Sequence, residues 1–276
     1  MQQNKPIVWF RADGNSSIGL GHVVRSLALA ELLAEYFDCR FLIRNPSENL
    51  KVQILSVCST LVELDNDIDI LQDAQNLTEQ HFKANDLVVL DGYHFTTHYQ
   101  QIVKKNGSKL VCIDDIYAYP FLADAIINHA GGIYPSHYKA LPETKFYLGL
   151  QYALLRSPFR IAAATRPQHR YSWQNMFICL GGADPNNETL KVLEIVTKHS
   201  LLDTYFVVVG SAYLHLEALM AFIQDSSSRI ILRQRLDAAE MVVQMQQCAI
   251  AVCSPSTVAF EYLSVGGTAL HTLNSG

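Results

Sequence analysis

The stretch IVWFRADGNSSIGLGHVVRSLALAELLAEYF, residues 7–37, decides the fold class of this chain. It opens with the apolar run Ile7–Phe10, which predicts a buried strand over 7–12. From position 22 onward, Val23, Leu27 and Ala30 recur at the spacing of one helix face, which predicts a helix over 22–37. A strand, a glycine-rich loop and a helix in this order are typical of the opening of an α/β domain.

The same alternation continues along most of the chain, in two successive series. The strands are continuously apolar rather than alternating, which is typical of a parallel sheet buried on both faces. The first series contains strand candidates at 39–43, 60–64, 87–91 and 109–114, with weaker extended segments at 125–128 and 145–155. The second contains strand candidates at 176–180, 205–209, 230–232, 249–253 and 269–273, and helix candidates at 187–199, 214–224, 238–247 and 257–265.

Two such series predict an α/β protein with two doubly wound parallel-sheet domains. The alternation lapses around Pro158 and Pro167, where the residues are polar and basic. We therefore expect a first domain over 1–157, a linker over 158–171 and a second domain over 172–276. Because the chain stops at Gly276 directly after a predicted strand, we expect a truncated C-terminus.

Composition limits the partners of this 276-residue chain. With 26 acidic and 21 basic residues the net charge is −5, and no basic cluster predicts a nucleic-acid surface. The apolar runs are far shorter than the ~20 residues of a membrane span. The six cysteines are scattered without a CxxC pair. We expect a reduced, cytoplasmic, monomeric protein without a membrane anchor.

The loop between the first strand and the first helix is the strongest candidate site. Gly14, Gly19 and Gly21 permit close backbone approach at a helix N-terminus, a geometry that suits a phosphate or a sugar oxygen. The spacing is neither GxGxxG nor a Walker A loop. Simple turn glycines do not account for the polar side chains around them, so we favour a ligand site. These polar residues are Arg11, Asp13, Asn15 and His22.

His22 lies in the first turn of the predicted helix, where the positive end of the dipole disfavours a protonated ring. The neutral imidazole is the form that a general base needs. We expect Asp13 to orient it. A packing or capping histidine explains the position equally well on spacing alone.

Further polar residues follow the next strands. Asp91 and Tyr93 stand where a parallel strand would direct them into the ligand crevice, although Asp91 also suits a helix cap and Tyr93 the core. His94 and His98 have helical spacing but lack the glutamate of HExxH. The Asp114–Asp115 pair more often forms a helix cap with a solvated neighbour than a Mg²⁺ site. We therefore expect neither metal nor cofactor.

The second series has two loops suited to a diphosphate. Gly181 and Gly182 precede a helix with an Asn cap. A second loop carries hydroxyls at Ser254, Ser256 and Thr257, and Glu261 follows one turn into the next helix. A carboxylate at that position accepts both ribose hydroxyls of a nucleotide, whereas the alternative is a partly solvated helix glutamate. No G-x-S-x-G elbow indicates a serine hydrolase.

These motifs together resemble one family. The segments are RADGNSSIGLGHVVRSLALA (11–30), LDGYHF (90–95), IDD (113–115), LGGADPNN (180–187) and STVAFE (256–261). They are similar to the UDP-2,4-diacetamido-2,4,6-trideoxy-β-L-altropyranose hydrolases of pseudaminic acid biosynthesis. That family is related to MurG-type glycosyltransferases, so the resemblance implies a GT-B fold, with two Rossmann-like domains facing a central cleft.

The resemblance also implies an activity: water cleaves the C1–O bond with inversion, without metal, releasing UDP and 2,4-diacetamido-2,4,6-trideoxy-L-altrose. His22 matches the catalytic histidine, Tyr93 a tyrosine beside the substrate, and Glu261 with Ser256 and Thr257 the nucleotide-binding region. Asn274 corresponds to an active-site Asn-Gln, except that Ser275 replaces the glutamine. A GT-B glycosyltransferase using a UDP-sugar donor is the alternative, and a non-catalytic sugar-nucleotide-binding module is a third.

Overall fold

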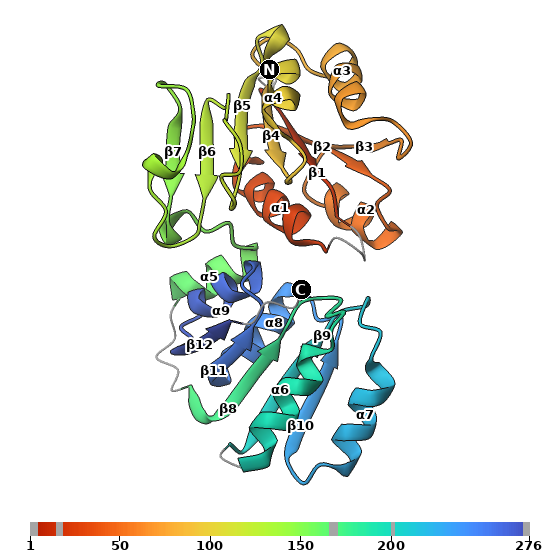
Figure 1. The fold of residues 1–276 in the computed structure, drawn as a ribbon, viewed down its shortest axis with the longest axis vertical. Coiled ribbons are helices and arrows are strands. Elements are labelled where there is room, and N and C mark those ends of the chain that lie inside the picture. Colours follow the sequence, from red (N-terminus) through yellow and green to blue (C-terminus); the bar gives the residue numbers. More distant parts are fainter. Residues whose placement is uncertain (1–4, 15–18, 166–170, 200–201, 273–276) are drawn as a thin grey trace. The chain divides into compact units, whose positions relative to one another are not determined.

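The computed structural model describes residues 5–14, 19–165, 171–199 and 202–272. The chain divides between Leu154 and Leu155 into two compact units. Each unit contains one parallel sheet with helices packed against it (Figure 1). Asn15 and Asn274, two of the predicted site residues, lie outside the described residues.

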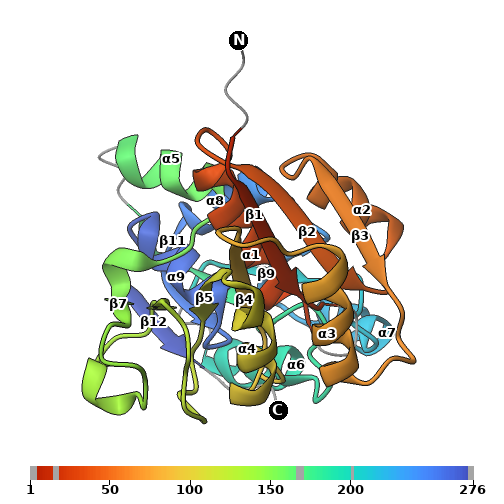
Figure 2. The same cartoon turned by 90° about the horizontal axis from the view of Figure 1, so that it is seen from above.

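The first unit has a seven-stranded parallel sheet in the order β3-β2-β1-β4-β5-β6-β7, part of which can be followed in Figure 2. The order reverses between β1 and β4, and such a switch point places a crevice at the carboxyl ends of the strands. The strands are β1 (Ile7–Ala12), β2 (Asp38–Arg44), β3 (Thr60–Leu64), β4 (Leu87–Asp91), β5 (Lys109–Ile113), β6 (Ala125–Asn128) and β7 (Lys145–Leu148). The helices are α1 (Gly21–Leu33), α2 (Glu48–Leu55), α3 (Ile70–Gln80) and α4 (Thr97–Val103).

Both faces of this sheet are buried, as strand β1 shows. Val8 and Phe10 belong to a hydrophobic cluster with residues of α1 and α2. Trp9 belongs to the opposite cluster, which contains residues of α3 and α4. Since successive side chains of a strand point to opposite faces, both sets must be apolar, which explains the continuous apolar runs.

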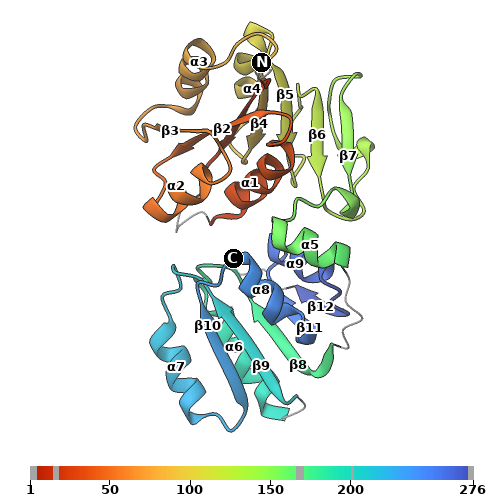
Figure 3. The same cartoon turned by 180° about the vertical axis from the view of Figure 1, so that it is seen from behind.

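The second unit has a five-stranded parallel sheet in the order β10-β9-β8-β11-β12. Residues of α6 and α7 join one hydrophobic cluster and residues of α5, α8 and α9 the other, so helices cover both faces (Figures 1 and 3). The strands are β8 (Ser172–Cys179), β9 (Thr204–Val209), β10 (Arg229–Gln234), β11 (Cys248–Cys253) and β12 (Ala269–Thr272). The helices are α5 (Ser157–Thr165), α6 (Glu188–Val196), α7 (Leu216–Asp225), α8 (Ala238–Met245) and α9 (Thr257–Ser264).

The predicted α/β class with two parallel sheets is confirmed. The predicted linker over 158–171 differs from the structure, because its residues 158–165 lie in α5, in which Phe159 and Ala162 are buried in the second unit's core. Pro158 lies in the first turn of this helix, where proline is tolerated because its missing N–H has no intrahelical partner.

Candidate functional site

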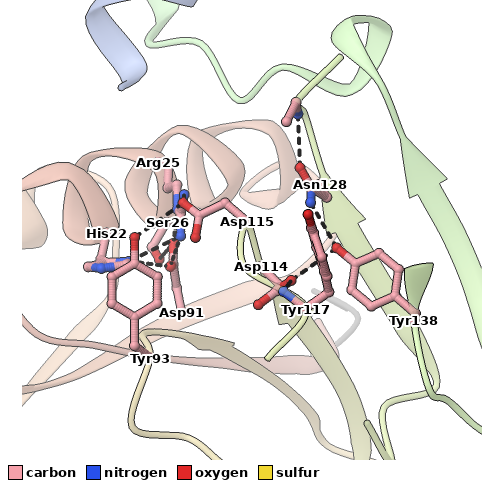
Figure 4. Close-up of polar contacts among 11 residues, drawn as sticks. His22, Arg25, Ser26, Asp91, Tyr93, Asp114, Asp115, Tyr117, Asn128 and Tyr138 are labelled. Carbon is pink, nitrogen blue, oxygen red and sulfur yellow. Dashed lines mark hydrogen bonds and ion pairs between the residues drawn. The ribbon is translucent and has the colours of Figure 1, made fainter. Parts of the chain in front are cut away.

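The candidate site of the first unit lies at the carboxyl ends of β4 and β5 and the start of α1. Asp91 is the last residue of β4, and Asp115 follows β5 by two positions. His22 and Arg25 come from the first two turns of α1. The polar side chains of these elements point toward one another in Figure 4.

The central contact joins His22 to Asp91. Nδ1 of His22 lies 2.7 Å from Oδ1 of Asp91, a carboxylate that is fully buried. With the proton on Nδ1 donated to this carboxylate, Nε2 carries the free lone pair. Asp91, and not the expected Asp13, orients the His22 ring, because β4 is the neighbour of β1 at the switch point.

Arg25 holds the buried carboxylate in place. Its Nε and Nη2 donate to the two oxygens of Asp91 at 2.7 and 2.6 Å, and the Ser26 hydroxyl adds a donor at 3.3 Å. Burial acts to raise the pKa of Asp91, but the Arg25 charge and the His22 hydrogen bond outweigh it and lower the pKa below its usual value. Asp91 is therefore ionised at neutral pH.

Arg25 also binds a second carboxylate. Its Nη1 donates to Oδ2 of Asp115 at 2.7 Å, and the hydroxyl of Tyr93 donates to the same oxygen at 3.5 Å. The Tyr93 ring is half exposed and meets the His22 ring edge-on, with centroids 4.8 Å apart. The structure therefore brings the Tyr93 ring against the His22 ring.

The Asp114–Asp115 pair does not act as a helix cap beside a solvated neighbour. Asp114 accepts from the Tyr117 amide at 2.8 Å and from the Tyr138 hydroxyl at 3.0 Å. Asn128 donates to that hydroxyl, which completes the second cluster in Figure 4. The neighbouring carboxylate is bound to Arg25. Within the described ranges, no three His, Cys, Asp or Glu side chains converge as metal ligands.

Sequence reasoning missed Arg25 and His129. Arg25 stands three residues after His22, so a polar residue on the buried face of the helix was the available signal. His129 follows β6 directly and is 6% exposed. Burial, together with the positive charge of Arg25, lowers the pKa of His129 to about 4, so its ring is neutral at pH 7.

Arg11 and Asp13 form a separate network. Arg11 is fully buried, donates to Asp13 at 2.5 Å and packs over the Phe95 ring. Asp13 also accepts from the Arg44 amide, and its other oxygen lies 3.4 Å from Nε2 of His94. His94 precedes α4 while His98 lies within it, so the two histidines do not share a helix face as their spacing had indicated.

The Gly181–Gly182 loop of the second unit is closely packed. Gly181 has a φ of +94°, and a Cβ on Gly210 would lie 2.5 Å from the Gly182 carbonyl oxygen. Asn187 is the N-cap residue of α6, as predicted, but its side chain makes no capping hydrogen bond. Asp184 instead accepts from the amides of Glu188 and Thr189 at 2.8 Å each. A carboxylate already occupies the start of α6, which makes it a poorer diphosphate site.

The start of α9, unlike that of α6, has no carboxylate bound to its first amides among the residues that the structure describes. Ser256 is its N-cap residue, and Ser254 and Ser256 contact each other through their hydroxyls at 2.9 Å. Within the described part of the chain, no side chain caps the first amides of α9. These amides and hydroxyls are suited to phosphate oxygens.

Glu261, one turn into α9, is held by an arginine. It is 2% exposed and accepts from Nε and Nη2 of Arg156 at 2.6 and 2.8 Å. Burial raises the pKa of Glu261, while Arg156 acts in the opposite direction. The bidentate contact fixes the orientation of the carboxylate, and the partly solvated glutamate that was the alternative is not observed.

Comparisons with solved structures identify the fold. MurG of Acinetobacter baumannii covers 97% of this chain, with 79% of its own length matched, at a TM-score of 0.61 and 14% identity. A glycosyltransferase of Rickettsia africae covers 99%, with 81% of its own length matched, at a TM-score of 0.61 and 10% identity. The chain has the GT-B fold. At these identities the likeness shows the fold alone.

The GT-B chain is also similar in sequence to curated proteins. It is 27% identical over 220 residues to the UDP-2,4-diacetamido-2,4,6-trideoxy-beta-L-altropyranose hydrolase of Campylobacter jejuni, which covers 78% of the chain and 73% of that protein. It is 26% identical over 264 residues to the spore coat polysaccharide biosynthesis protein SpsG of Bacillus subtilis. The match covers 92% of the chain and 74% of that protein.

An uncharacterized protein of Methanocaldococcus jannaschii is 24% identical over 265 residues, and the chain spans about half, 53%, of its length. No family model matches the chain. Among the described residues, no helix combines the length and the apolar character that crossing a membrane requires.

Proposed function

We propose that this GT-B protein hydrolyses a UDP-sugar at C1, with His22 as the general base. The observation that carries the proposal is the 2.7 Å contact from Nδ1 of His22 to the buried Asp91, which leaves Nε2 to accept a proton. The similarity to the Campylobacter hydrolase supports a UDP-2,4-diacetamido-2,4,6-trideoxy-β-L-altropyranose substrate. The products are UDP and 2,4-diacetamido-2,4,6-trideoxy-L-altrose.

The reaction is a single displacement. Nε2 of neutral His22 takes a proton from water while the water oxygen bonds to C1, and the C1–O bond to UDP breaks with its electron pair on the diphosphate. Because water attacks opposite the departing group, the configuration at C1 inverts. Asp91 stabilises the imidazolium that forms, as a buried carboxylate does for a base.

The proposal assigns UDP to the second unit. The hydroxyls of Ser254, Ser256 and Thr257 and the uncapped amides of α9 are suited to the diphosphate. The helix dipole stabilises the negative charge of the leaving group there without a metal ion. Glu261, oriented by Arg156, accepts from the ribose hydroxyls. Gly181 and Gly182 contribute close backbone approach.

In the first unit, we propose that Tyr93, Asp91 and Gly21 lie beside the bound sugar. Arg11 and Asp13 support this edge of the sheet through their buried pair. Asn15 and Asn274 remain predicted substrate contacts outside the described residues.

A GT-B glycosyltransferase is the competing function, since the same base would deprotonate an acceptor hydroxyl. The deciding experiment is incubation of the protein with a panel of UDP-diacetamido sugars in ¹⁸O-labelled water without any acceptor, followed by NMR and mass spectrometry. We expect release of UDP and label on the free sugar, not on UDP. Turnover only after an acceptor is added would establish the transferase instead.

A further inference from the structure

Arg25 and Asp115 lie behind the His22–Asp91 pair and form a chain of alternating charge. Arg25 is 5% exposed, and its guanidinium donates two N–H groups to Asp91 and one to Asp115. The two carboxylates come from different strand ends, 66 and 90 residues from Arg25 in sequence. A buried guanidinium held by two anions has a fixed position and a permanent charge.

Arg25 also reaches the base. Its Nη2 lies 3.1 Å from Nδ1 of His22, close to the 2.7 Å contact between His22 and Asp91. A cation at this distance disfavours a second proton on the imidazole, whereas Asp91 favours it. The two influences oppose each other, so the state of His22 depends on how far the Arg25 charge is compensated.

The compensating group is Asp115. Its Oδ2 accepts from Arg25 and from Tyr93, while Oδ1 is buried with no hydrogen-bond partner in the part of the chain that the structure describes. Arg25, at 2.7 Å, is therefore a stronger donor to the Asp115 carboxylate than Tyr93, at 3.5 Å. Among the described residues, the charged and titratable groups that face the cluster come from four places: α1, the ends of β4 and β5, and the segment after β6. They are Arg25, Asp91, Tyr93, Asp114, Asp115, Tyr119, His129 and Tyr138.

We propose that Asp115 is a positioning residue that, acting through Arg25, sets the balance between neutral and protonated His22. The inference rests on the proposed function, in which neutral His22 removes the proton from water. Loss of the Asp115 charge leaves Arg25 less compensated, so His22 holds its proton less tightly. Loss of the Arg25 charge has the opposite effect.

The test is titration of the His22 ring by NMR, with its resonance assigned by its absence in His22→Asn. In Asp115→Asn we expect the titration midpoint to fall by about 0.3–1 pH unit, the size expected for one partly screened charge several ångströms away. The acid limb of kcat should move by the same amount in the same direction. Asp124→Asn, which removes a carboxylate ion-paired with Lys104, is the matched control and should move neither.

Arg25 supplies the second arm. Arg25→Lys keeps the charge but loses the bidentate fork, so kcat should fall by about tenfold while the midpoint stays within about 0.3 pH unit of wild type. Arg25→Met should raise the midpoint of the His22 titration. This variant leaves two carboxylates without their cation and can fail to fold, so the result for Asp115→Asn decides the test.

An unchanged or raised midpoint in Asp115→Asn would overturn the inference, since a purely structural role predicts no downward shift. Failure of the proposed function is distinguishable from this result. It would appear as no UDP release from any UDP-sugar by the wild-type protein, and the NMR titration does not depend on turnover.

Discussion

Nδ1 of His22 lies 2.7 Å from Oδ1 of Asp91, although 69 residues separate them in the chain. The parallel pairing of β1 with β4 produces this contact, because it places the residue that ends β4 beside the helix that follows β1. Asp91 therefore selects the ring orientation in which Nε2 is free.

Asp91→Asn should lower kcat by about 10²–10⁴-fold, because an amide neither selects the productive tautomer nor stabilises the imidazolium. UDP affinity, measured by calorimetry, should be unchanged. Asp124→Asn is the control for loss of a carboxylate in the same unit. Turnover near the wild-type rate in a folded Asp91→Asn protein would show that His22 is oriented by another group.

Much of the fold was predictable, because buried parallel strands require apolar residues on both faces, as Val8 and Trp9 illustrate. Helix α5 was not predictable, since a proline in the first turn of a helix, such as Pro158, cannot be told from a proline in a linker by its local sequence. The sequence singled out His22, Asp91 and Tyr93, and the structure brings these three side chains together. The partner of His22 was not predictable, because strand order decides it, and sequence spacing pointed to the nearer Asp13.

Glu261→Gln should weaken UDP binding by about 1–3 kcal/mol, because the carboxylate that we propose accepts the ribose hydroxyls is lost together with its Arg156 contact. Calorimetric titration with UDP measures the change. Glu194→Gln, an exposed position on α6, is the matched control. Equal affinities in the two variants would remove Glu261 from the nucleotide site.

Exhaustive chelation with EDTA should leave turnover unchanged. The carboxylates that most resemble a Mg²⁺ site are already engaged, Asp114 by Tyr117 and Tyr138 and Asp115 by Arg25. Initial rates before and after chelation provide the measurement. A loss of rate that Mg²⁺ or Mn²⁺ restores would contradict metal-independent hydrolysis.

His129 should make the protein less stable in acid. Its pKa is about 4 in the folded protein and near 6.5 when unfolded. Between these values the unfolded chain binds a proton that the folded protein does not, so the free energy of unfolding decreases as pH falls from 6.5 to 4. His129→Asn should reduce this decrease by about 1–3 kcal/mol.

Urea denaturation at pH 7.5 and pH 4.5 measures the difference, with the exposed His98→Asn on α4 as the control. If the two substitutions change the acid sensitivity equally, burial of His129 is not its cause.

The central claim is that His22 removes the proton from the attacking water. Its most direct test is the initial rate of UDP release from UDP-2,4-diacetamido-2,4,6-trideoxy-β-L-altropyranose, without acceptor, by wild type and His22→Asn. We expect kcat to fall by about 10²–10⁴-fold in the variant, with UDP affinity unchanged. A folded His22→Asn protein that releases UDP at close to the wild-type rate would contradict the account.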